Sequence, residues 1–151
     1  VIRLHPYDEA LGDNDTLMWS NTWPNLKIDR GTSPIWSNYK KSKLLIFSYN
    51  STGFLESLAL NVPTMALWAN DKRFLREEVL SDYEALEHAD VLFDDPEDAA
   101  THFKAISENP GEWWFSDRVQ SAVTAFSEKY AKRTKDPLSN FYKSIKRNLN
   151  H

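Results

Sequence analysis

The residues best suited to chemistry form a short polar segment, Asn50-Ser51-Thr52-Gly53, between the apolar run LLIFSY and a helical stretch. The first N–H groups of a helix have no intrahelical partner, and the helix dipole makes them attractive to an anion. The two hydroxyls could add donors, and the glycine lets a phosphate approach the backbone closely. The alternative is an ordinary helix N-cap, for which Asn, Ser and Thr are favoured residues.

One acid, Glu56, favours the anion site over the cap. A capping box needs its Glu three residues after a Ser or Thr cap, whereas Glu56 is five residues after Ser51 and four after Thr52. Only a cap at Gly53 would give that spacing. Glu56 also lies off the centre of the stripe expected to be buried, which comprises Leu55, Leu58, Ala59 and Val62. A carboxylate one turn into the helix can accept hydrogen bonds from the vicinal hydroxyls of a ribose, so phosphate donors and a diol acceptor together predict a nucleotide site.

A histidine ends another apolar run. His5 follows VIRL, and Pro6 stops the strand and fixes the turn. An imidazole titrates near neutral pH, so it can donate to a phosphate oxygen or protonate a leaving group. The alternative is a histidine that simply faces solvent at the end of a strand. Ligands of doubly wound sheets bind beyond the carboxyl ends of the strands, so we expect His5 and the polar segment to face one crevice.

The elements that must position these residues alternate along the chain. Short apolar runs predict strands at 1–4, 26–28, 44–49, 64–68 and 91–93, and helices are expected at 34–42, 52–61, 73–88 and 96–108. Such alternation predicts an α/β fold with a Rossmann-like parallel sheet flanked by helices. The unalternated run LLIF suits a strand buried on both faces. Two long helices are expected after residue 110, with apolar stripes Val119, Ala122, Val123, Phe126, Tyr130 and Leu138, Phe141, Tyr142, Ile145, Leu149.

Composition excludes several classes of protein. The net charge of −4 gives no electrostatic basis for a nucleic-acid partner, and the absence of cysteine excludes disulfides and thiolate metal sites. No apolar stretch reaches membrane-spanning length, so we expect a cytoplasmic protein. We expect residues 1–151 to form one domain. Because Val1 opens directly on a strand-like run, we also expect it to be the carboxyl-terminal part of a longer protein.

Three other groups of residues have two interpretations each. Asp94-Asp95 could ligate a metal, but Asp95 before Pro96 is better suited to capping the helix that follows. The aromatic run Trp113-Trp114-Phe115, expected to open the penultimate helix, favours core packing or docking on a partner domain over a sugar platform. Basic residues on the last helix, Lys143, Lys146 and Arg147, suit either a solvated face or a peripheral contact with the inner membrane face.

The two polar strand ends carry a family resemblance. RLHP, followed by SYNST, resembles the His-Pro and Ser-Ser/Thr motifs of GT-B glycosyltransferases that use CMP-activated sugars, such as sialyltransferases and Kdo transferases. Three longer segments are similar to transferases of bacterial surface-carbohydrate clusters: YNSTGFLESLALNVPTMALW, LREEVLSDYEALEHADVLFDDPEDAATHF and EWWFSDRVQSAVTAFSEKYA. The chain departs from the motif in having Thr52 at the second hydroxyl position.

The resemblance implies the donor-binding half of an inverting GT-B glycosyltransferase that needs neither metal nor cofactor. Asn50, Ser51, Thr52 and Gly53 would bind the donor phosphate, His5 would contact it and assist its departure, and Glu56 would hold the ribose. Gly31, in the loop DRGTSP, is implied near the base.

The implied partners are a nucleotide-sugar, a glycan or lipid-linked acceptor, and an N-terminal GT-B domain that supplies the catalytic base. Two alternatives stay open. One is a GT-B-like epimerase or hydrolase acting on a UDP-sugar. The other is a non-catalytic Rossmann-like interaction module that binds a protein through its Trp-rich helices.

Overall fold

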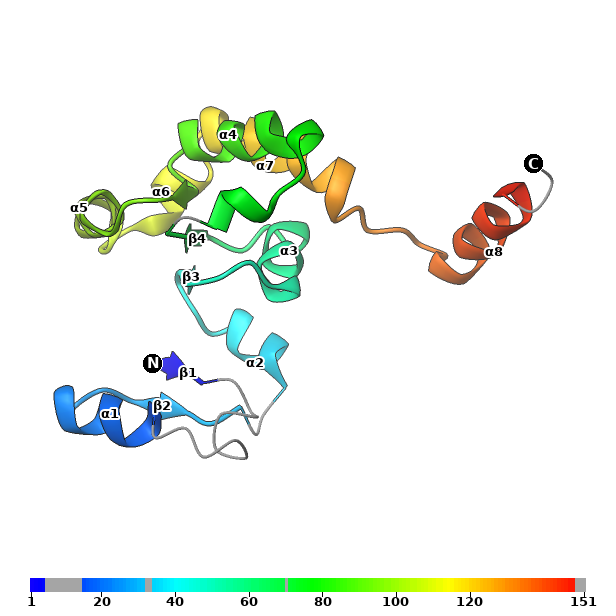
Figure 1. Cartoon of the computed structure of the whole chain (residues 1–151). Helices are drawn as coiled ribbons and strands as arrows, with labels where there is room; N and C mark the ends of the chain where they lie inside the picture. Colours follow the sequence, from blue (N-terminus) through cyan, green and yellow to red (C-terminus); the bar gives the residue numbers. More distant parts are fainter. Residues whose placement is uncertain (5–14, 32–33, 70, 149–151) are drawn as a thin grey trace. The chain divides into compact units, whose positions relative to one another are not determined.

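The fold is given by a computed structural model that describes residues 1–4, 15–31, 34–69 and 71–148. The chain divides into two compact units, Val1–Ser42 and Lys43–His151 (Figure 1). Each unit contains its own parallel sheet. That both units belong to one nucleotide-binding domain stays a prediction.

The first unit pairs two short strands side by side. Its described elements are β1 (Ile2–Arg3), α1 (Asp15–Thr22), β2 (Ile28–Asp29) and α2 (Ile35–Tyr39). The strands β1 and β2 are parallel, with Ile2 opposite Ile28 and Arg3 opposite Asp29. The strand expected at 26–28 therefore lies slightly later in the chain. Helix α1 was not expected, because its sequence DTLMWSNT has no clear apolar stripe.

The second unit is a three-stranded parallel sheet with helices on both faces. Its elements are β3 (Leu45–Phe47), α3 (Thr52–Ala59), β4 (Thr64–Leu67), the 3₁₀ helices η1 (Asp71–Phe74) and η2 (Glu77–Val79), α4 (Leu80–His88), β5 (Leu92–Phe93), α5 (Pro96–Ile106), α6 (Pro110–Trp114), α7 (Asp117–Tyr130) and α8 (Pro137–Asn148). The strand order is β3-β4-β5. This arrangement confirms the predicted α/β class with a Rossmann-like parallel sheet.

The side chains of β4 alternate between two apolar clusters. Ala66, and Trp68 just after the strand, pack in a cluster with residues of α3, α4 and α7. Met65 and Leu67 belong to a second cluster, together with Ala99 and Ile106 of α5. The central strand is thus covered on both faces, which is the condition that favours a continuous apolar run over an alternating one.

The prediction that LLIF is the strand buried on both faces is wrong. Ile46, in the middle of β3, is 57% exposed. It pairs with Met65 and so shares the face that α5 covers, but α5 packs on β5, two strands away from β3. Within the three-stranded sheet, β3 is an edge strand, and the fully covered strand is β4.

Two local predictions about helices also need correction. The aromatic run 113–115 does not open the penultimate helix, because it closes the separate short helix α6, and α7 begins at Asp117. The most buried residues of α3 are Gly53, Phe54, Ser57 and Leu58, whereas Leu55 and Ala59 are only half-buried. The α7 stripe is confirmed, since Val119, Val123 and Phe126 are buried.

The turns that follow α3 and α4 are tied to α6 and α7. Each turn contains a residue in the left-handed region, Asn61 with φ 53° and Asp90 with φ 58°. The indole Nε1 of Trp114 donates to Asn61 Oδ1 over 2.8 Å, and Arg118 forms an ion pair with Asp90. These contacts fix the chain just before it enters β4 and β5. No helix in the described ranges has the length and apolarity that crossing a bilayer would require.

Candidate anion site at the start of α3

The polar segment connects β3 to α3, as the sequence predicts. Ser51 is the N-cap residue, with extended backbone angles of φ −133° and ψ 158°, and Thr52 is the first helical residue. The backbone oxygen of Ser51 accepts a hydrogen bond from the N–H of Phe54. The side chain of Ser51, by contrast, makes no capping hydrogen bond. The hydroxyl therefore does not do the task that explains Ser at most helix starts.

The N-cap side chains of two other helices in the same unit are engaged in hydrogen bonds, one as a cap and the other with a carbonyl outside the helix. At α5, Asp95 Oδ1 accepts hydrogen bonds from the N–H groups of Glu97 and Asp98, over 2.9 and 3.0 Å. At α7, Ser116 does not cap, but its hydroxyl donates to the carbonyl of Trp113 over 2.7 Å. The capping interpretation of Asp95 is confirmed. Ser51 differs from Asp95 in that its side chain makes no capping hydrogen bond to the first turn of its helix.

Glu56, the predicted acceptor of the ribose hydroxyls, lies on the solvent-facing side of α3. Thr52 and Glu56 are both exposed, and their spacing of four residues places them one above the other on the helix surface. Because Ser51 is the cap, Glu56 is the fifth helical residue, two positions beyond the capping-box position. Asn50 is exposed, Ser51 is half-buried, and Gly53 is buried in the first turn. The structure thus brings five of the seven predicted residues together at one helix start.

The remaining two predicted residues, His5 and Gly31, come from the amino-terminal part of the sequence. His5 falls outside the described residues, so its proximity to the polar segment stays a prediction. Gly31 follows β2 and has a φ of 76°, a left-handed conformation that glycine adopts without strain. Its role near a base also stays a prediction.

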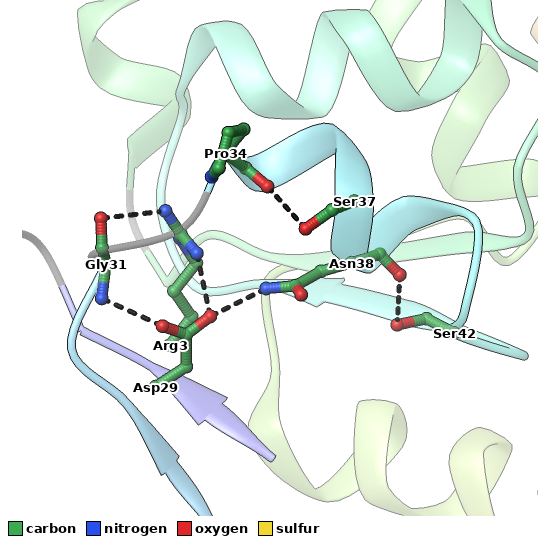
Figure 2. A network of polar contacts seen from close by, with 7 residues as sticks. All are labelled: Arg3, Asp29, Gly31, Pro34, Ser37, Asn38 and Ser42. Carbon is green, nitrogen blue, oxygen red and sulfur yellow. Dashed lines mark hydrogen bonds and ion pairs between the residues drawn. The ribbon is translucent and has the colours of Figure 1, made fainter.

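The conformation of Gly31 is held by a polar network that sequence reasoning missed (Figure 2). Asp29 Oδ1 accepts a hydrogen bond from the Gly31 N–H over 2.9 Å. Its other oxygen, Oδ2, accepts from Arg3 Nη1 and from Asn38 Nδ2, each over 2.7 Å. Arg3 also reaches the carbonyl of Gly31, over 3.3 Å. The sequence contains a signal for one contact of this network, because an Asp two residues before a Gly is typical of an Asx turn.

The network also sets the charge of Asp29. Partial burial acts to raise the pKa of its carboxyl group, but the hydrogen bonds from Asn38, Gly31 and Arg3 and the charge of Arg3 together lower the pKa below its ordinary value. Asp29 is therefore an ionised anchor that joins β1, β2 and α2. One of its oxygens bonds the loop that carries Gly31, and the other bonds Arg3 and Asn38.

The described part of the chain offers no clear set of metal ligands. No group of three or more His, Asp or Glu side chains gathers there, and Asp95 is occupied as a cap. The chemistry available at α3 is instead that of hydrogen-bond donors and a helix dipole. Such an arrangement can hold an anion and stabilise charge that develops on it.

These features define an α/β protein of Rossmann-like type with polar residues at the carboxyl end of a parallel strand. The chain belongs to the LIC12162 family of transferases, whose family model matches residues 1–145. Comparisons with curated proteins and with solved structures gave no significant match. The family supports a transferase role in general terms.

Proposed function

We propose that this transferase binds a nucleotide-sugar donor, with CMP as the nucleotide, at the start of α3. The observation that carries the proposal is the uncapped Ser51 side chain at the carboxyl end of β3. Serine at an N-cap is ordinarily explained by its capping bond, and here that bond is not made. A donor phosphate at this position would accept hydrogen bonds from Ser51 and Thr52 and would lie in the positive field of the helix end.

The ribose would lie along the helix surface, one turn further in. Glu56 is exposed and in line with Thr52, so its carboxylate can accept hydrogen bonds from the 2′ and 3′ hydroxyls. Asn50, also exposed, adds an amide at the phosphate. That Gly31 lies near the base stays a prediction from the family resemblance.

The reaction we propose is an inverting glycosyl transfer in bacterial surface polysaccharide synthesis, in the cytoplasm. The acceptor oxygen forms a bond to the anomeric carbon while the bond from that carbon to the phosphate oxygen breaks. The electron pair of the broken bond leaves on the phosphate, and a base takes the acceptor proton. Ser51, Thr52 and the dipole of α3 stabilise the leaving phosphate, and His5 assists by donating a hydrogen bond or a proton.

Nuclear magnetic resonance titration of the chain with CMP and related ligands tests the proposal. CMP should shift the amide signals of residues 50–56, including Glu56. Cytidine, which lacks the phosphate, should lose the response at Ser51 and Thr52, and 2′,3′-dideoxy-CMP should lose the response at Glu56. UDP and GDP in the same titration test the choice of nucleotide.

Matched variants make the titration specific. Glu56→Gln should weaken CMP binding, whereas Glu84→Gln, an equal change at an exposed position of α4, should leave binding unchanged. If CMP shifts no signal in the 50–56 segment of a folded sample, the proposed donor site is wrong.

A further inference from the structure

Helix α8 has a surface that the proposed donor site does not use. Its apolar side chains Leu138, Phe141, Tyr142 and Ile145 are 80%, 66%, 64% and 42% exposed. Their spacing of three and four residues places them within an arc of about 100° on one side of the helix. Four large apolar residues on one exposed helix face are more than scattered surface hydrophobics.

The charge around this face is of one sign. Helix α8 contains Lys143, Lys146 and Arg147, all exposed, and no acidic residue. The segment 131–148 carries six Lys or Arg and one Asp, a formal charge of +5, although the whole chain carries −4. The single acid, Asp136, is occupied locally, because its Oδ1 accepts a hydrogen bond from the Ser139 N–H over 3.0 Å.

The basic side chains of α8 lie beside the apolar arc and across the helix from it. At about 100° per residue, Lys146 lies about 80° from Leu138 and so borders the arc, whereas Lys143 at about 140° and Arg147 at about 180° lie on the polar side. The Lys146 ammonium lies over the Tyr142 ring, 5.9 Å from its centre, so this charge lies beside the apolar arc.

We propose that α8 binds the chain to the surface of a membrane that contains anionic lipids. An amphipathic helix with aromatic and aliphatic residues on one face and lysines beside them lies in the plane of the headgroups. The 12 residues of α8 are too few to span a bilayer, for which about 20 are needed. The positive charge of α8 complements the negative surface potential of anionic lipids. This inference is independent of the proposed donor site.

Co-sedimentation of the chain with vesicles tests the charge complementarity. The chain should bind vesicles of phosphatidylcholine mixed with phosphatidylglycerol, and should bind pure phosphatidylcholine much more weakly. Each positive charge near an anionic surface strengthens binding roughly five-fold, so Lys143→Glu with Lys146→Glu should weaken it by about 30-fold or more. Lys40→Glu with Lys41→Glu makes the same change in net charge at exposed positions of the first unit and should have little effect.

A second pair of variants tests the apolar face. Phe141→Ser with Ile145→Ser should abolish most vesicle binding, because both side chains would enter the acyl boundary. Leu17→Ser with Phe74→Ser removes two exposed apolar residues elsewhere and should not. Circular dichroism would check that all variants keep their secondary structure.

Site-specific labelling gives the orientation of the helix. The chain has no cysteine, so a single cysteine placed by Leu138→Cys or by Asn140→Cys takes an environment-sensitive dye at one position. The dye at position 138 should brighten and shift to the blue on vesicle binding, and the dye at position 140, on the opposite side of the helix, should not. Absence of binding to the anionic vesicles, or equal dye responses at both positions, would overturn the proposal, as would docking of α8 on a protein surface without vesicle binding.

Discussion

Replacing Ser51 should weaken ligand binding with little change in stability, because its side chain makes no capping hydrogen bond. In Ser51→Ala no capping hydrogen bond is lost, so the free energy of unfolding should change by at most about 0.5 kcal/mol. Asp95→Ala removes an acceptor of two backbone N–H bonds at the start of α5 and should cost about 1 kcal/mol, within a range of roughly 0.5–2 kcal/mol. Both residues lie in the unit Lys43–His151, so urea unfolding of that unit measures both effects in one transition.

In a nucleotide titration the order of the two effects should reverse: Ser51→Ala should weaken CMP binding more than Asp95→Ala does. A hydrogen bond to a charged group contributes about 1.5–3 kcal/mol, so loss of the Ser51 hydroxyl should weaken CMP binding by roughly 10- to 100-fold. Asp95→Ala should leave the CMP affinity unchanged. Ser51 does not have the proposed role if Ser51→Ala destabilises the unit as much as Asp95→Ala does, or if its CMP affinity equals that of the unsubstituted chain.

Three further predictions concern stability. Asn61→Ala should cost about 2 kcal/mol, because alanine is strained at a φ of 53° and the bond from Trp114 is lost; Asn61→Gly should cost less in the same urea titration. Burial lowers the pKa of His102, with Arg118 adding to the effect and Asp90 opposing it, so the folded unit favours neutral imidazole. The free energy of unfolding should therefore fall as pH drops below the ordinary value of 6.5, and a His102→Phe variant should lack that slope. Asp29→Asn should destabilise the first unit by about 1–3 kcal/mol and speed hydrogen exchange at the Gly31 amide, whereas unchanged exchange would contradict the proposed anchor.

Local chemistry could be predicted from the sequence wherever one short segment determines the outcome. Asp95 before Pro96 marks the start of α5 because capping depends on neighbouring residues alone. The stripe of α7 was equally readable, since its apolar spacing is that of a helix face. The polar segment before α3 was placed correctly for the same reason.

Features that depend on distant contacts could not be predicted. Trp114 is buried in the main apolar cluster, and its indole donates to Asn61, 53 residues earlier; no local pattern shows that pairing. The apolar runs of β3 and β4 look alike in sequence, and only the strand order makes β4 the covered one. The Asp29 network could be predicted only in part. The Asx turn to Gly31 is local, but the bonds from Arg3 and Asn38 come from other elements.

The measurement that tests the donor site most directly is a crystal structure of the chain in complex with CMP. The phosphate should lie within hydrogen-bond distance of the Ser51 and Thr52 hydroxyls at the start of α3, with the ribose hydroxyls on the Glu56 carboxylate. A phosphate bound away from α3, with Ser51 unchanged and Glu56 in solvent, would contradict it.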